Sequence, residues 1–280
     1  MSILRKVRSR EVNLFEALVV GLVQGLTEFV PVSSSGHLVV VPWLFGWPEP
    51  GLAFDTVVHL GTLVAVLAFF AGDFVALGRG WLRSVRTRTL PDDDARVAWM
   101  LIVGTVPAAV AGVLLADWFE QMFSQPALVG GFFIVTAALL LVAERLGRQN
   151  RELATVGIVA ALFIGSAQAL AICPGISRSG ATIAAGLAIG LARPVAARFS
   201  FLLSAPIILA AAGSQALALA DVGLGGSQLS ALVVGFGAAA ISGYLCIGFL
   251  LRYLQARGLH VFAGYCLVVG LATILLATLA

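Results

Sequence analysis

One cluster of polar residues near the N-terminus has the spacing of a catalytic site. Its members are Gln24, Glu28, Ser33, Ser34, Ser35 and His37. Gln24 and Glu28 are four residues apart, so a helix would place both on one face just before Pro31 ends it. If the first serine caps the following helix, Ser34 and His37 share the face of its first turn. The spacing therefore predicts a carboxylate, a hydroxyl and an imidazole around one turn.

A second polar cluster, 140 residues further on, has the character of a phosphate site. It contains Ser177, Arg178, Ser179 and Thr182. The cluster follows the turn-forming pair Pro174-Gly175, so its residues are expected to begin a new helix. Arg178 and Thr182 would lie on one face of that helix. A helix N-terminus with hydroxyl groups and a guanidinium suits a phosphate group.

The composition of the chain indicates that both clusters lie in a membrane. Of its 280 residues, 60% are hydrophobic and only 11% are charged, against about 25% charged in soluble domains. Six stretches are apolar over the roughly 20 residues that a spanning helix needs. They are about 54–72, 97–116, 127–144, 197–219, 228–251 and 259–279. The predicted fold is an all-α polytopic membrane protein, a single membrane domain over 1–280.

The two regions that hold the polar clusters, 13–46 and 154–191, are apolar but broken in the middle. Irregular backbone at membrane depth survives only where protein or a wet cavity covers it. We therefore predict two re-entrant helical hairpins, with two ordinary kinked spans as the alternative. Ionisable residues inside a membrane cost about 2.5–3.5 kcal/mol each, so those at the breaks are candidates for function.

The chain also shows signs of an internal duplication. Gln24 precedes Gly36 by the same twelve residues that separate Gln168 from Gly180. The small residues Gly104, Ala108 and Gly112 correspond at a constant offset to Gly235, Ala239 and Gly243. These matches predict a first repeat over about 13–146 and a second over about 154–280, each a hairpin followed by three spans. Three spans are an odd number, so the repeats would have inverted topology and their polar turns would face each other. Chance matches among small residues are the alternative.

The arginines predict the orientation. They are concentrated in the connections 73–96, 145–153, 192–198 and 252–258, whereas the opposite loops near 117–126 and 220–227 contain no Lys or Arg. Positive residues favour the cytoplasmic side, so both termini are expected outside. The basic N-terminal segment is an exception to this assignment. Arginines distributed in this way are typical of membrane topology and not of a nucleic-acid partner.

Two segments of the chain resemble signatures of a known family. The first segment is 24–37, Gln-Gly-Leu-Thr-Glu-Phe-Val-Pro-Val-Ser-Ser-Ser-Gly-His, and the second is 174–182, Pro-Gly-Ile-Ser-Arg-Ser-Gly-Ala-Thr. Both are similar to signatures of the bacitracin-resistance type of undecaprenyl-pyrophosphate phosphatases. The resemblance covers essentially the whole chain. It implies hydrolysis of undecaprenyl pyrophosphate to undecaprenyl phosphate and inorganic phosphate in the plasma membrane. That reaction recycles the lipid carrier for peptidoglycan and other envelope polymers and confers bacitracin resistance, with a site open to the outer face.

The resemblance also implies a divalent cation, Mg²⁺ or Ca²⁺. The aromatic and leucine stripes are interpreted as packing or lipid-facing, so no organic cofactor is expected. The first signature of the family starts with Glu or Gln, and this chain has Gln24. Glu28 is then the only motif carboxylate available to a metal, so a cation held mainly by the pyrophosphate is expected. Gln24 is expected to orient other groups by hydrogen bonding.

These considerations assign provisional roles to the polar residues. Glu28, Ser34, His37 and Arg178 are the catalytic candidates. The candidates for substrate binding are Gln24, Ser33, Ser35, Ser177, Ser179 and Thr182. Ser34 could attack phosphorus and form a phosphoserine, or only bind phosphate while Glu28 or His37 activates water. For His59, structural pairing is the favoured interpretation.

A transporter or flippase of a polyprenyl phosphate lipid is the competing function, because inverted repeats are common in transporters. A transporter needs no nucleophile beside its phosphate site, so the cluster at Glu28 and Ser34 favours the enzyme. The sequence leaves open the prenyl chain length and the oligomeric state, a homodimer included.

Overall fold

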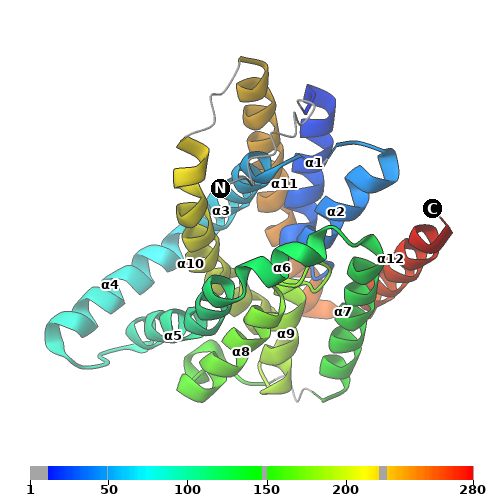
Figure 1. Cartoon of the computed structure of the whole chain (residues 1–280). Helices are drawn as coiled ribbons and strands as arrows, with labels where there is room; N and C mark the ends of the chain where they lie inside the picture. Colours follow the sequence, from blue (N-terminus) through cyan, green and yellow to red (C-terminus); the bar gives the residue numbers. More distant parts are fainter. Residues whose placement is uncertain (1–11, 49, 147–149, 221–225, 280) are drawn as a thin grey trace.

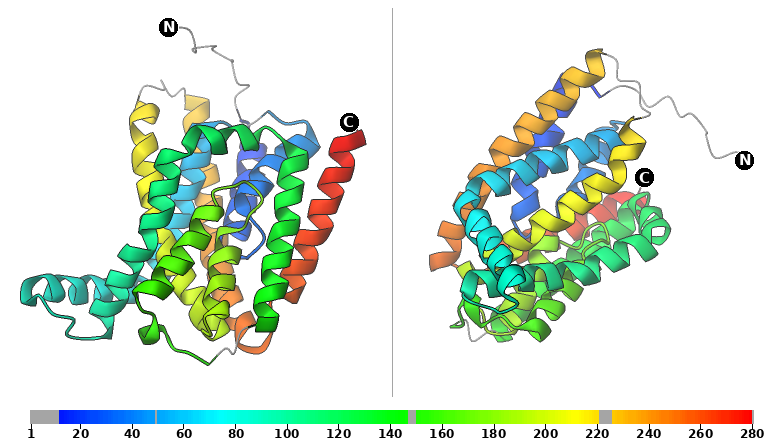
Figure 2. Two further views of the ribbon diagram at one scale, coloured as in Figure 1. Left: turned by 60° about the horizontal axis from the view of Figure 1, so that its bottom comes forward. Right: turned by 90° about the vertical axis from the view of Figure 1, so that its left-hand side faces the viewer.

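The computed structural model describes residues 12–48, 50–146, 150–220 and 226–279 and confirms the all-α prediction (Figure 1). Lys6, the arginines between positions 5 and 10, Arg148 and Asp221 lie outside the described residues. The long helices run side by side in one bundle (Figure 2). The elements, in chain order, are α1 (Leu14–Phe29), α2 (Ser34–Phe45), α3 (Leu52–Phe69), α4 (Ala71–Thr87), α5 (Asp93–Leu114), α6 (Ala116–Phe123), α7 (Pro126–Leu146), the 3₁₀ turn η1 (Leu153–Thr155), α8 (Ile158–Leu170), α9 (Arg178–Ala188), α10 (Arg193–Ala220), α11 (Gly226–Ala256) and α12 (His260–Leu279).

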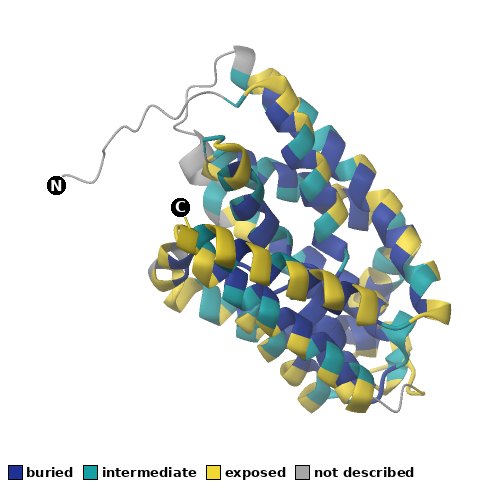
Figure 3. Cartoon of the chain, turned by 90° about the vertical axis from the view of Figure 1, so that its right-hand side faces the viewer, coloured by how far each residue is buried: buried dark blue, intermediate teal, exposed yellow. Residues whose placement is uncertain are grey.

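Six of these helices are long and apolar enough to cross a bilayer, as predicted. They are α3, α5, α7, α10, α11 and α12. Exposed residues lie along the outer faces of the helices (Figure 3), and many of the exposed residues are large hydrophobic ones. An exposed apolar exterior is the surface expected of a protein whose solvent is lipid. The chain is therefore a multi-pass membrane protein.

Two predicted connections contain helices that the sequence analysis missed. The arginine-rich connection 73–96 contains most of α4 and the start of α5, and the loop near 117–126 contains most of α6. In α4, the buried residues Leu77, Gly80 and Ser84 follow a helical period and pack towards α5. Such a helix is too polar to be identified as a span, although its apolar face is sufficient to dock it against the bundle.

The two polar regions each form a pair of short helices, α1 with α2 and α8 with α9. The longest of the four, α1, has 16 residues and so measures about 24 Å, less than the roughly 30 Å of a hydrocarbon core. In the first pair the break includes Ser33, which has the positive φ of 69°. In the second pair the break includes Gly175, with a φ of 103°. The predicted breaks at these positions are confirmed.

Helices from the two halves of the chain pack against each other. Helix α1 packs along α11, α8 packs along α5, and α7 packs along α12. The first two contacts are both close at pairs of glycines. A Cβ added at Gly21 would lie 2.5 Å from the carbonyl oxygen of Gly235, and one at Gly165 would lie 2.2 Å from that of Gly104. Only glycine permits backbones to approach in this way.

The helix ends gather at two opposite ends of the bundle. The start of α1 and the end of α12 lie at one end (Figure 2, left). The turns between α4 and α5, between α9 and α10, and between α11 and α12 lie at the other. All three turns belong to the predicted arginine-rich connections, so the structure collects these connections at one end.

Candidate functional site

Helix α1 delivers a carboxylate to the first turn. Gln24 and Glu28 lie on one face as predicted, and Gln24 Nε2 donates a hydrogen bond of 3.0 Å to Glu28 Oε2. The same carboxylate oxygen accepts a hydrogen bond from Ser34 Oγ at the start of α2. The hydroxyl and the carboxylate therefore touch across the break in the hairpin.

The second hairpin brings a cation to this carboxylate. Arg178, the first residue of α9, donates from Nη2 to Glu28 Oε1, although 150 positions separate the two residues. The Glu28 side chain is 3% exposed and that of Arg178 is 19% exposed. A buried carboxylate is tolerated when a cation and hydrogen-bond donors compensate for lost hydration. Glu28 has all of these partners.

Direct contacts between the two turns fix the hairpins relative to each other. Ser179 Oγ donates a hydrogen bond of 3.1 Å to the carbonyl oxygen of Val30 in the first turn. A Cβ added at Gly36 would lie 3.0 Å from the Cα of Gly175 and 2.6 Å from the Phe133 ring. Because both turns carry glycine, the two helix N-termini can meet in a space that side chains would otherwise fill.

Two buried polar atoms of this cluster lack a hydrogen-bond partner within the part of the chain that the structure describes. Among the described residues, the buried Nη1 of Arg178 and Oε1 of Gln24 have no hydrogen-bond partner. Buried polar groups are normally paired, so each unpaired one requires an explanation. A guanidinium nitrogen with free N–H groups can donate to an anion without first giving up another partner.

His37 forms hydrogen bonds with Ser33 and Tyr265, although its spacing predicts a helix face shared with Ser34. Its Nδ1 donates to the carbonyl oxygen of Ser33 over 2.6 Å, and its Nε2 lies 2.7 Å from the hydroxyl of Tyr265 on α12. The carbonyl can only accept, so in the neutral ring Nε2 is the acceptor and Tyr265 is the donor. Within the described chain, no hydrogen bond joins His37 to Glu28, Ser34 or Arg178.

The other serines stabilise the two turns. Ser33 Oγ accepts the backbone N–H of Gly36 over 3.3 Å, and Ser177 Oγ accepts that of Gly180 over 3.0 Å. Both residues therefore cap their helices. Ser35 contacts Ser33 in the first turn at 3.3 Å between hydroxyls, and Ser179 contacts Ser177 in the second at 3.2 Å. The two turns have the same local hydrogen-bond pattern.

Thr182 is buried behind the second turn. Its Oγ1 donates to the carbonyl oxygen of Arg178 over 2.8 Å and lies 2.6 Å from Ser200 Oγ. It shares a helix face with Arg178, but its hydroxyl is engaged by these partners and makes no contact with Glu28 or Ser34 among the described residues. In this structure Thr182 supports the helix that carries Arg178.

The structure adds two residues to the cluster that the sequence analysis did not place there. His59 on α3 has Nε2 4.0 Å from Glu28 Oε2, and its Nδ1 donates to the Asp55 carbonyl. Tyr265 reaches His37 from the last helix. The polar residue His59 within an apolar span was a signal that could have been used, whereas nothing in the sequence marks Tyr265.

The protein groups do not fit a metal cage. No group of three or more His, Cys, Asp or Glu side chains able to hold a metal occurs among the described residues. Both oxygens of Glu28 already accept hydrogen bonds, one from Arg178 and the other from Gln24 and Ser34. A cation ligand surrounded by donors and a guanidinium would be electrostatically unfavourable. The side chains of this cluster therefore supply no ligand set for a cation.

Comparison with known proteins gives this cluster a family context. The model of the family "Bacitracin resistance protein BacA" matches residues 17–272. An undecaprenyl-diphosphatase from Thermomicrobium roseum is 45% identical over 276 residues, covering 96% of this chain and 99% of the relative. An undecaprenyl-diphosphatase from Pelobacter propionicus is 43% identical, and the alignment covers 94% of this chain and 96% of the relative. One from Rubrobacter xylanophilus is 45% identical, and the alignment covers 90% of this chain and 94% of the relative. The family match extends from within α1 into α12 and includes both polar turns, so the chain belongs to the bacitracin resistance protein BacA family.

Proposed function

We propose that this protein hydrolyses undecaprenyl diphosphate to undecaprenyl phosphate and inorganic phosphate. The family and the names of its relatives give the reaction class. The observation that carries the proposal is the contact of Ser34 and Arg178 with the same carboxylate, Glu28, while Arg178 Nη1 remains free to bind an anion. A nucleophile, a proton acceptor and a phosphate-binding cation therefore lie in direct contact.

In the membrane, the helix pairs α1–α2 and α8–α9 are proposed to be re-entrant hairpins of two inverted repeats, about 13–146 and about 154–280. Three observations support this arrangement. The helices of each pair are too short to cross the membrane alone. Both turns have the same kind of serine cap. The close approach of α1 to α11 at Gly21 and Gly235 has a counterpart in the approach of α8 to α5 at Gly165 and Gly104. An inverted repeat relates two such contacts by exchanging the halves of the chain.

The arginine-rich end is proposed to face the cytoplasm and the site to open to the outer face of the plasma membrane. The support is the collection of the arginine-rich connections at one end of the bundle (Figure 2) and the preference of positive residues for the cytoplasmic side. The prenyl tail would then lie in the outer leaflet among the helices, where exposed apolar side chains are abundant. Both ends of the chain would lie outside.

Substrate binding begins with exchange of partners at Arg178. The terminal phosphate first meets the free Nη1 and then competes with Glu28 for the rest of the guanidinium, since a bidentate contact with phosphate is favourable. The N-terminal turns of α2 and α9, which meet at this point, add the positive ends of two helix dipoles. Glu28 is then released from its ion pair and can accept a proton.

The chemical step follows from the contact between Ser34 and Glu28. Ser34 Oγ forms a bond to the terminal phosphorus while the bridging P–O bond breaks, and its proton passes through Glu28 to the departing lipid phosphate. Water then replaces Ser34 on phosphorus, one water proton returns to Oγ, and inorganic phosphate leaves. Arg178 offsets the charge that develops on the phosphoryl oxygens.

The rival route uses water as the nucleophile, activated by Glu28 or His37, while Ser34 only binds phosphate. The hydrogen bond of His37 to Tyr265 favours the serine route, because His37 would have to leave Tyr265 before acting on water. The same serine–carboxylate contact favours hydrolysis over transport of a polyprenyl phosphate. A cation held by the diphosphate itself stays a prediction.

The test is release of inorganic phosphate from undecaprenyl diphosphate by the purified chain in detergent. Arg178→Ala should abolish release, because the cation of the site is lost. The matched control is Arg198→Ala, which removes an arginine that pairs with Asp73 away from the site and should leave release unchanged. Full activity of Arg178→Ala, or no activity of the folded native chain, would refute the proposal.

A further inference from the structure

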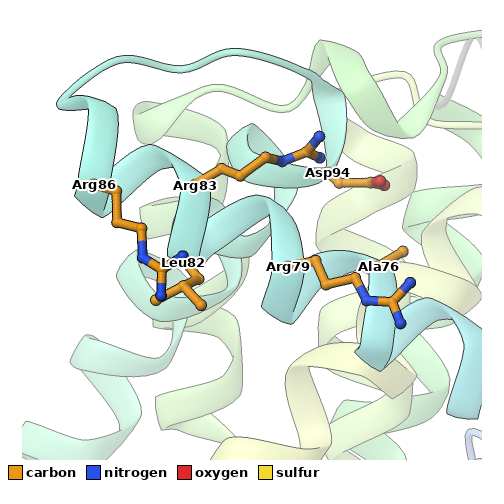
Figure 4. A pocket seen from close by; sticks show the side chains of 6 residues that line it. All are labelled: Ala76, Arg79, Leu82, Arg83, Arg86 and Asp94. Atoms are coloured by element: carbon orange, nitrogen blue, oxygen red, sulfur yellow. The ribbon is translucent and has the colours of Figure 1, made fainter.

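Helix α4 and the start of α5 line an open basic hollow that has no part in the proposed reaction. The hollow has a volume of about 490 Å³. It is lined by Ala76, Arg79, Leu82, Arg83, Arg86 and Asp94 (Figure 4). Three arginines and one aspartate give this lining a net charge of two positive. The lining therefore favours an anion.

The neighbouring acids satisfy only part of this positive charge. Arg83 Nη2 pairs with Asp92 Oδ2 at 2.6 Å. At the other end of α4, Asp73 is already paired with Arg198. Among the described residues, Arg79 and Arg86 have no hydrogen-bond or ion-pair partner. Two guanidinium groups on the rim of the hollow are thus available to a ligand.

An apolar stripe runs along α4 beside the arginines. Val75, Leu82 and Val85 are exposed and lie within about 80° of one another around the helix axis at 100° per residue. Trp81 extends this stripe and is also exposed. In Figure 2 (left), α4 projects sideways from the bundle, across the direction of the long helices. A helix with an apolar stripe, an arginine stripe and an interfacial tryptophan is suited to lie in a membrane surface.

We propose that this hollow binds the head group of an anionic phospholipid from the leaflet at the arginine-rich end of the bundle. Arg79 and Arg86 hold the phosphate and the negative head group, while Val75, Leu82 and Val85 contact the first methylene groups of the acyl chains. Charge complementarity and the adjoining apolar stripe point to a lipid, because a soluble anion has no use for the stripe. A zwitterionic lipid presents no net charge to the arginines and binds weakly.

The experiment measures binding of phosphatidylglycerol to the purified full-length chain in a non-ionic detergent, with phosphatidylcholine and inorganic phosphate as comparison ligands. The test variant is Arg79→Gln/Arg86→Gln. Its matched control is Arg96→Gln/Arg145→Gln, two exposed arginines that lie outside the lining of this hollow. Each arginine near a lipid surface contributes about 1 kcal/mol, so the test variant should bind phosphatidylglycerol about 30-fold more weakly.

The control variant should bind phosphatidylglycerol within about twofold of the native chain, and native binding should weaken as salt is added. Phosphate release should be unchanged in the test variant, which also shows that it is folded. The proposal is overturned if the test variant binds as the native chain does, or if both variants lose affinity equally. It is also overturned if phosphatidylcholine binds equally well, or if inorganic phosphate at millimolar concentration displaces the lipid.

Discussion

The ion pair that joins the two hairpins should be measurable in the stability of the protein. Glu28→Gln keeps the size of the side chain but leaves the guanidinium of Arg178 without a counter-charge. Breaking a buried pair in this way costs about 3–5 kcal/mol, and Arg178 is 19% exposed, which places the expected loss near the lower end. A loss of about 3 kcal/mol corresponds to a fall in Tm of roughly 6–12 °C for a chain of this size.

A double-mutant cycle isolates the pair from the other contacts of each residue. Arg178→Gln alone should also lower Tm, since it leaves a buried carboxylate unpaired. The double variant Glu28→Gln/Arg178→Gln should lose clearly less than the sum of the single losses. The matched control is the exposed pair Asp73–Arg198, for which the same cycle should give a coupling energy below about 1 kcal/mol. Thermal unfolding in detergent is the assay, and additive losses at Glu28 and Arg178 would refute a direct contact between the hairpins.

Three further predictions follow from the site and the helix packing. Tyr265→Phe removes a neutral donor to His37, and kcat should stay unchanged because the serine route gives His37 no step. A fall in kcat of about 2- to 12-fold, equivalent to the 0.5–1.5 kcal/mol of one neutral hydrogen bond, would contradict this and show that His37 takes part in the reaction. Gly165→Val should lower Tm strongly, because its Cβ would lie 2.2 Å from a backbone oxygen of α5. The control Gly131→Val should lower Tm little, because a Cβ at Gly131 meets no atom within 4 Å. Equal shifts in Tm would contradict the close approach of α8 to α5. In acid-quenched single-turnover reactions, ³²P from the terminal phosphate should be trapped on the native chain but not on Ser34→Ala; absence of label on both would favour water as the nucleophile.

The features that the sequence predicts well are those set by local pattern. Six spans follow from apolar length. The breaks follow from local residues, because Pro31 and Pro174 restrict the backbone, Ser33 caps the following helix and Gly175 permits a positive φ. The predicted duplication, with an odd number of spans in each repeat, led us to expect that the two polar turns face each other, and Glu28 does pair with Arg178.

The remaining features depend on packing that the sequence does not encode locally. Tyr265 lies 228 residues from His37 on a helix whose apolar pattern gives no sign of a polar partner. Thr182 has the spacing to face a substrate together with Arg178, but its short hydroxyl bonds to its own helix and to Ser200 instead. The helix α4 was missed because its apolar stripe is narrow and its arginines lower the mean hydropathy of the segment below that of a span.

The most direct test of the central claim is a structure with a non-hydrolysable prenyl methylenediphosphonate bound. The account predicts that the terminal phosphonate lies within about 3 Å of Arg178 Nη1 and of Ser34 Oγ, which is hydrogen-bond distance, and that the guanidinium has moved away from Glu28. A head group bound elsewhere, with the pair between Glu28 and Arg178 intact, would contradict it.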